Sequence, residues 1–412
     1  MRPREIRDAG RLTGRTLGDV AAVVRDVHRA TSRRVFDTLG PVATPVRWAH
    51  DSISAVAHTS TAVGVRGIPV VAGLVGAGVQ AARGGGRTVH DSPTGRFTTA
   101  AVAGVFGDRI ARDQPALAPP LAVRTERGPL RRSPADLVDD VVADAGPAGV
   151  GGRVVVFAHG LCESDMSWRV GARRHWGDPD VTYGSRLRDD AGWTPLYLTY
   201  NTGRHVADNG RDVAGLLAAV VDRWPVPVTD IALIGHSMGG LVLRSAVAQS
   251  NGQAWSKSLR HLVFLGTPHL GAPLEQAVHR AGHTLAAQPE TAPFATLLRR
   301  RSVGIKDLRH GALVAADWGD AHPDDDLPDR CTVTPFPDGV AVHAVGVTLA
   351  RRHDSVLGRT VGDLLVRFES AGSLGHATRV LPGDGVLHLG GLHHFDLLDH
   401  PGVYAVLRDR LR

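Results

Sequence analysis

The segment at residues 230–249 restricts the fold of this chain more than any other. The sequence Gly235-His236-Ser237-Met238-Gly239 follows an apolar run typical of a buried strand and precedes a stretch with helical character. A G-x-S-x-G sequence in that context marks a sharp turn from strand to helix, which lifts the serine above the sheet. The flanking glycines leave room for the backbone to fold back on itself. We therefore predict that Ser237 is a nucleophile; a passive serine in a structural turn is the alternative.

The remainder of the C-terminal two thirds alternates between strands and helices. The strand candidates are apolar runs of strand length at residues 121–124, 154–158, 196–200, 231–234, 261–265 and 340–347. Helical patterns follow at residues 206–224, 238–249 and 401–411. This alternation predicts an α/β fold with a mostly parallel sheet covered by helices on both faces.

The N-terminal region has a different, helical character. Leu17, Val20 and Val24 recur at helical spacing, and residues 53–82 are rich in alanine, glycine and valine. We expect the latter stretch to break at Gly67 and Pro69. The sequence thus divides into a helical N-terminal extension (1–112), a linker with first strands (113–149) and a catalytic domain (150–412). The apolar stretch either packs on the rest of the protein or contacts a membrane or partner.

Charge and composition narrow the functional class. The formal charge is +6, but only Lys257 and Lys306 are lysines and the arginines are spread along the chain, so we expect a solvated surface and no nucleic-acid partner. No apolar run follows the N-terminal arginines, and residues 67–82 are short and glycine-rich for a membrane span. We expect a cytoplasmic protein, with peripheral membrane contact through the N-terminal region left open. Cys162 and Cys331 have no metal-site spacing, and their pairing also stays open.

A serine nucleophile needs a histidine base and an acid that orients it, and the expected chain order is Ser, acid, His. Residues 391–398, Gly-Leu-His-His-Phe-Asp-Leu-Leu, resemble the histidine loop before the last helix of bacterial lipases. The x-H-x-x-L-L spacing of that loop favours His394 over His393. For the acid, residues 362–366 are similar to the G-D-x-L-V segment of lipases, which favours Asp363. Its rivals are Asp354 and Asp384.

An oxyanion hole requires two backbone N–H groups aimed at one point. One is expected from Met238, the residue after the nucleophile. The other is expected from the loop after the strand at 154–158, where His159-Gly160-Leu161 resembles the H-G-x element of lipases and assigns the donor to Leu161. We expect His159 to brace this loop without transferring a proton.

Together with Gly-Thr-Pro-His-Leu-Gly at residues 266–271, these segments resemble the α/β-hydrolase superfamily, in particular lipase-like and PGAP1-like esterases. The resemblance covers about residues 150–412. It implies a serine carboxylester hydrolase of small-molecule or lipid esters, active in lipid metabolism without cofactor or metal. An acyltransferase, a thioesterase or amidase, and a non-catalytic binding protein remain alternatives. Residues 270–335 are expected to form a cap or lid, or else a plain helical connection.

Overall fold

A computed structural model describes all residues except 40–43, 84–85, 147–148, 288, 290, 326–331, 356–357, 359–361, 374–380 and 383–385. Two of the residues discussed above, Cys331 and Asp384, lie outside this described part. The chain divides into two compact units. Unit 1 comprises residues 1–92, 109–118 and 277–301, and unit 2 comprises residues 93–108, 119–276 and 302–412.

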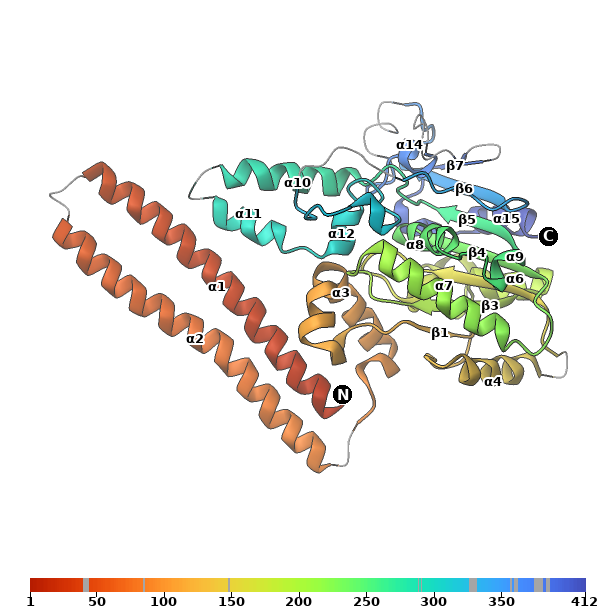
Figure 1. Ribbon diagram of the computed structural model, residues 1–412, viewed down its shortest axis with the longest axis horizontal. Coiled ribbons are helices and arrows are strands. Elements are labelled where there is room, and N and C mark those ends of the chain that lie inside the picture. The colour runs from red at the N-terminus through yellow and green to blue at the C-terminus, as the bar shows by residue number, and fades with distance from the viewer. Residues whose placement is uncertain are drawn as a thin grey trace. The chain divides into compact units, whose positions relative to one another are not determined.

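Unit 2 is built on a seven-stranded sheet with the order β1-β3-β2-β4-β5-β6-β7 (Figure 1). The strands are β1 (Ala122–Arg124), β2 (Arg153–Ala158), β3 (Thr194–Thr199), β4 (Asp230–His236), β5 (Leu259–Leu265), β6 (Ala341–Thr348) and β7 (Val386–Gly390). Only β1 is antiparallel to its neighbour. This is the α/β-hydrolase arrangement, so the predicted fold class is confirmed. The sequence did not indicate β7, because this edge strand is only partly buried and lacks the continuous apolar run of a central strand.

Two apolar layers cover the faces of the sheet. Along β2, Val154 and Val156 belong to one layer, while Val155 and Phe157 belong to the other, as the two-residue period of a strand requires. Side chains of α4 (Pro134–Ala145), α7 (Val206–Asp222) and α8 (Met238–Ala248) pack on the first face. Side chains of α6 (Tyr183–Ala191) and α15 (Pro401–Arg410) pack on the second. Since both faces are covered, the carboxyl ends of the parallel strands form the exposed edge at which such sheets place functional groups.

The helices of unit 2 include α4 (Pro134–Ala145), α5 (Ala172–Trp176), α6 (Tyr183–Ala191), α7 (Val206–Asp222), α8 (Met238–Ala248), α9 (Ala254–Lys257), α12 (Val303–Asp307), α14 (Phe368–Ala371) and α15 (Pro401–Arg410). Short 3-10 helices are η5 (Asp165–Arg169), η6 (Ala315–Asp317) and η7 (His394–Leu398). Helices α3 (Pro93–Asp113) and α10 (Pro273–Ala286) each begin in unit 2 and end in unit 1. The described part of the expected cap at 270–335 includes α10, α12 and η6, and residues 277–301 group with unit 1, so a lid role stays a prediction.

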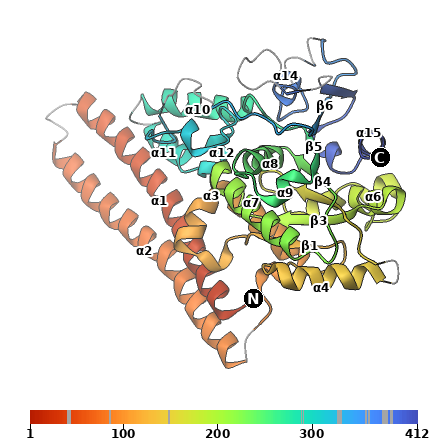
Figure 2. The same ribbon diagram turned by 45° about the vertical axis from the view of Figure 1, so that its right-hand side comes forward.

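Unit 1 contains two long helices, α1 (Pro3–Leu39) and α2 (Thr44–Ala82), together with η2 (Val89–Asp91), η3 (Pro115–Leu117) and α11 (Ala292–Arg299). Helices α1 and α2 lie side by side along their length (Figures 1 and 2). The expected break at Gly67 and Pro69 is wrong, because α2 runs through both residues. A proline costs one helical hydrogen bond and favours a kink, but continuous packing against α1 keeps the helix intact.

Candidate active site

Ser237 occupies a sharp turn between β4 and α8. Its backbone angles, φ 51° and ψ −124°, are unusual for a residue with a side chain, and its N–H donates to Leu265 O at 2.8 Å. A side chain on Gly239 would collide with the carbonyls that end β2, and one on Gly240 would collide with Thr267. The glycines therefore allow the helix to begin directly behind the serine, so the N-terminal end of α8 faces any negative charge that develops there.

His394 and Asp363 form a buried pair at the same edge of the sheet. His394 Nδ1 lies 2.6 Å from Asp363 Oδ2, and both side chains are 2% exposed. The other carboxylate oxygen, Oδ1, accepts hydrogen bonds from the N–H groups of Leu365 and Val366 at 2.9 and 2.7 Å. The Asp363 carbonyl also accepts from His394 N–H at 3.1 Å. The carboxylate is thus fixed from two sides, and it holds the imidazole by Nδ1.

The other imidazole nitrogen of His394 is the free one. Within the described residues, its Nε2 is buried and makes no hydrogen bond. The ring lies against Gly266, where a Cβ would be 3.1 Å from His394 Cε1. Gly266 follows Leu265, whose carbonyl accepts from Ser237 N–H, so the His394 ring and the serine turn both contact the carboxyl end of β5. A hydrogen bond between a serine nucleophile and its histidine base is often absent until substrate binds.

The rival residues occupy other environments. Asp354 is exposed and bonds to Arg352, whose guanidinium lowers its pKa to about 2. His393 is exposed and caps the 3-10 helix that begins at His394, and its Nδ1 lies 3.4 Å from Asp396 Oδ2. Asp384 lies outside the described residues. The structure therefore brings His394 and Asp363 together and leaves Asp354 and His393 apart from them.

The loop after β2 lies directly against Ser237. A Cβ on Gly160 would be 3.0 Å from Ser237 Cβ, so only glycine permits this approach. Leu161 is the next residue of the loop. Met238 is the first residue of α8, where backbone N–H groups have no acceptor within the helix. Both predicted donors thus belong to segments that adjoin the serine.

His159 holds this loop in place, as its neighbours show. Its Nδ1 lies 3.0 Å from Gly160 O, and its ring stacks on Tyr200 at 4.4 Å. The Tyr200 hydroxyl donates to the His159 carbonyl. Burial lowers the pKa of His159, which favours the neutral ring and fits a bracing role.

A second buried pair, which the sequence did not reveal, lies beneath the serine. Glu163 accepts from Gly160 N–H at 2.7 Å and lies 3.0 Å from His236 Nδ1. His236 Nε2 lies 3.2 Å from the carbonyl of His394. This pair connects the loop after β2, at Gly160, to the segment that carries His394. No local motif could have found it, because its partners are 73 residues apart in a chain with 21 histidines.

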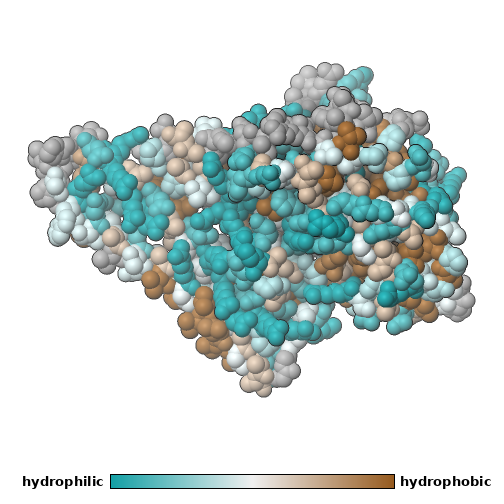
Figure 3. Space-filling model, viewed as in Figure 1, coloured by the Kyte–Doolittle hydropathy of each residue, from teal (hydrophilic) through white to brown (hydrophobic). Residues whose placement is uncertain are grey.

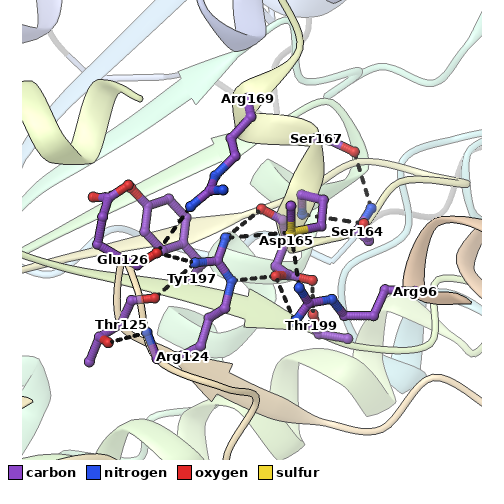
Figure 4. A network of polar contacts seen from close by, with 12 residues as sticks. Arg96, Arg124, Thr125, Glu126, Ser164, Asp165, Ser167, Arg169, Tyr197 and Thr199 are labelled. Atoms are coloured by element: carbon purple, nitrogen blue, oxygen red, sulfur yellow. Dashed lines mark hydrogen bonds and ion pairs between the residues drawn. The ribbon is translucent and has the colours of Figure 1, made fainter. Parts of the chain in front are cut away.

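A polar network anchors the segment that follows this loop (Figure 4). Arg124 of β1 donates to the buried Asp165 carboxylate, and Thr199 of β3 donates to the same carboxylate at 3.0 Å. Arg96 lies 3.5 Å from it. Because Asp165 is two residues from Glu163, the network fixes the far end of the loop after β2 to the sheet.

Two further features bear on ligands. Within the described ranges, no cluster of three or more His, Cys, Asp or Glu side chains is arranged to hold a metal ion. Cys162, in the loop after β2, carries a free thiol whose pKa is raised to about 11 by burial and by the nearby Glu163. It is therefore protonated at neutral pH and is a poor rival nucleophile.

Comparison with known proteins agrees with the resemblance read from the sequence. Residues 149–322 match the family model described as a PGAP1-like alpha/beta domain. No curated protein sequence matches the chain.

Among solved structures, the mature Bacillus licheniformis lipase BlEst2 is 19% identical, with 63% of this chain and 91% of that chain covered and a TM-score of 0.40. Phospholipase PlaB from Legionella pneumophila is 15% identical, with coverages of 64% and 60% and a TM-score of 0.39. By the family match, residues 149–322 are similar to a PGAP1-like alpha/beta domain.

Proposed function

We propose that the protein is a serine carboxylester hydrolase of small-molecule or lipid esters, with Ser237, His394 and Asp363 as its catalytic triad. The observation that carries this proposal is the buried His394–Asp363 pair beside a strained serine turn. The acid fixes Nδ1 of the imidazole, so Nε2 is available as the base. His394 Nε2 is buried and makes no hydrogen bond in the described chain, so no other group of the described residues competes for it.

The reaction proceeds in two steps. Ser237 Oγ attacks the ester carbonyl while His394 Nε2 accepts the hydroxyl proton, and the carbonyl oxygen becomes an oxyanion. The N–H groups of Leu161 and Met238 donate to this oxyanion. The tetrahedral intermediate then expels the alcohol, which takes the proton from His394, and leaves an acyl-serine. Water, deprotonated by His394, attacks the acyl group and releases the acid and the free serine.

The environment of the triad supports this chemistry. Burial of the His394–Asp363 pair strengthens its electrostatic interactions, because the surroundings are less polarisable than water. The positive end of α8 also favours the oxyanion. All groups used in both steps come from the chain and from water, so the proposed reaction calls for no cofactor.

The test is hydrolysis of p-nitrophenyl esters of graded chain length by the wild type and by Ser237→Ala. We expect the variant to lose about 10⁴-fold or more in kcat. Ser60→Ala, which alters an exposed serine of α2, is the matched control and keeps its activity. We also expect a fluorophosphonate probe to label the wild type and not Ser237→Ala.

Equal ester turnover by wild type and Ser237→Ala would refute the proposed nucleophile. Labelling of Ser237 without turnover of any ester would refute the ester substrate and turn attention to thioesters and amides.

A further inference from the structure

The outer side of α2 carries a long apolar face with no charged residue. Seven large apolar side chains on it are 47–71% exposed: Ile53, Val63, Ile68, Val71, Leu74, Val75 and Val79. At 100° per residue they fall within one half of the helix, and the residues that touch α1 lie on the other half. Figure 3 shows hydrophobic side chains gathered along the C-terminal part of this helix.

The composition of α2 sets it apart from an ordinary surface helix. Between residues 52 and 82 the only charged side chain is Arg66, which is turned towards Gly18 of α1. By length and composition, residues 50–82 would suffice to cross a membrane, and only 6% of their most apolar window is buried. Exposed apolar patches of this extent mark interaction sites.

The net positive charge of the chain is concentrated in residues 1–92, which include α2. Residues 1–92 hold 13 arginines and no lysine against seven acidic residues, a net charge of +6, which equals the formal charge of the whole chain. Basic and acidic residues therefore balance in residues 93–412. Arg47 stands before the uncharged part of α2, and Arg83 and Arg87 follow it. A basic region that frames an apolar face fits an anionic lipid surface.

The packing of α1 on α2 determines how the pair can meet a bilayer. Gly10, Gly14 and Gly18 of α1 approach α2 so closely that a Cβ on any of them would collide with Pro69 or Arg66. Near the other end, His58 Nε2 lies 3.3 Å from His28 Nδ1. Since α1 carries eight arginines and five acidic residues, the paired helices cannot both enter hydrocarbon. The pair must lie along the surface.

We propose that the α1–α2 pair is a membrane-docking module, which lies in the plane of an anionic bilayer with the outer face of α2 among the acyl chains. The apolar face, from Ile53 to Val79, is about 40 Å long at 1.5 Å per residue. The arginines of α1 and those that flank α2 contact lipid phosphates. The module holds the protein at a surface independently of the chemistry of Ser237.

The experiment is flotation of the full chain with vesicles made of equal parts phosphatidylcholine and phosphatidylglycerol. The test variant is Val71→Glu with Val75→Glu, which adds two charges to the centre of the apolar face. The control is Val142→Glu with Val170→Glu, which adds the same charge at two exposed valines of unit 2. Both variants replace exposed side chains, so both are expected to fold.

We expect the test variant to lose binding by about tenfold or more, while the control binds within about twofold of the wild type. We expect pure phosphatidylcholine vesicles to bind the wild type more weakly, and alkaline carbonate to release it. Equal binding by the wild type and the test variant would overturn the proposal. Retention in carbonate would overturn the in-plane geometry and indicate a spanning helix. A lipid-free dimer that only the test variant loses, without vesicle binding, would show that a second copy covers the face.

Discussion

At the scale of single residues, the pair of Glu163 and His236 connects the loop after β2 to the segment that carries His394. Burial by itself lowers the pKa of His236, but the Glu163 carboxylate more than offsets this, so the pKa is raised. Burial likewise raises the pKa of Glu163, and the charge and hydrogen bond of His236 reverse the effect. The pair is therefore a buried, mutually stabilised ion pair that touches both Gly160 and the His394 carbonyl.

This position makes Glu163 a positioning residue for the proposed oxyanion hole. We expect Glu163→Gln to lower kcat by about 10- to 100-fold with a smaller change in KM, because misplacing one oxyanion donor weakens transition-state binding more than substrate binding. Glutamine keeps an acceptor for Gly160 N–H but removes the charge that holds His236. Steady-state kinetics on a p-nitrophenyl ester measures both constants.

Two further variants separate positioning from folding. Glu163→Asp retains the charge and should recover part of the lost kcat. Asp189→Asn, at an exposed carboxylate paired with Arg188, should leave both constants unchanged. A rise in KM at constant kcat in Glu163→Gln would contradict the positioning role.

The triad residues could be predicted from the sequence, whereas Glu163 and His236 could not. Ser237 could be predicted because its turn is local: strand, glycines and helix adjoin in the chain. His394 and Asp363 could be placed through short family-like segments, and the structure puts them 2.6 Å apart. Glu163 and His236 have no such signal, since each is an ordinary residue until the fold buries both.

At the scale of elements, the glycines of α1 determine how closely α2 can approach. Gly14 meets the backbone carbonyl of Arg66, and Gly73 of α2 meets Gly10, where a Cβ would lie 3.0 Å from the Gly10 Cα. Gly64, Gly67 and Gly78 of α2 have nothing within 4 Å of their Cβ positions. The first group of glycines therefore permits close helix packing, whereas the second group makes no contact that requires a glycine.

This difference gives opposite expectations for the same substitution. Gly64→Ala should stabilise the helix pair by about 0.5–1 kcal/mol, because alanine has the higher helix propensity and its methyl group meets nothing. Gly14→Ala should destabilise the pair, because the methyl group pushes Arg66 and α2 away from α1. Hydrogen exchange of backbone amides in α1 and α2 checks both, with slower exchange for Gly64→Ala and faster exchange for Gly14→Ala. Equal effects of the two variants would show that the close contact contributes nothing.

The helices also show which elements a sequence can define. The periodicity of α1 and the alternation of strands and helices in unit 2 indicated these elements correctly. The continuity of α2 was missed, because Gly67 and Pro69 are local signals for a break and the contacts that oppose a break come from another helix. Strand β7 was missed because an edge strand does not need to be apolar on both faces.

At the scale of the whole molecule, one buried carboxyl couples folding to pH. Asp399, just before α15, accepts from Trp176 Nε1 at 2.7 Å, and its other oxygen has no partner among the described residues. Burial raises the pKa of Asp399 to about 7, and the bond from Trp176 offsets only part of this. The sequence gives no sign of this coupling, since the partners are 223 residues apart.

The sign of the effect follows from the raised pKa. Between pH 3.8 and about 7 the unfolded chain loses the Asp399 proton while the folded chain keeps it, so rising pH favours unfolding. We expect Asp399→Asn to remove this slope. The free energy of unfolding of the variant relative to wild type should therefore rise by roughly 3 kcal/mol between pH 5 and about pH 7, at 1.4 kcal/mol per pKa unit, and level off above that pH. Urea titrations followed by tryptophan fluorescence from pH 5 to 8.5 measure this free energy, since six of the seven tryptophans lie in unit 2.

Asp409→Asn, at an exposed carboxylate of α15, should leave the slope as in the wild type. Parallel pH profiles for Asp399→Asn and the wild type would mean that Asp399 is ionised in the folded protein.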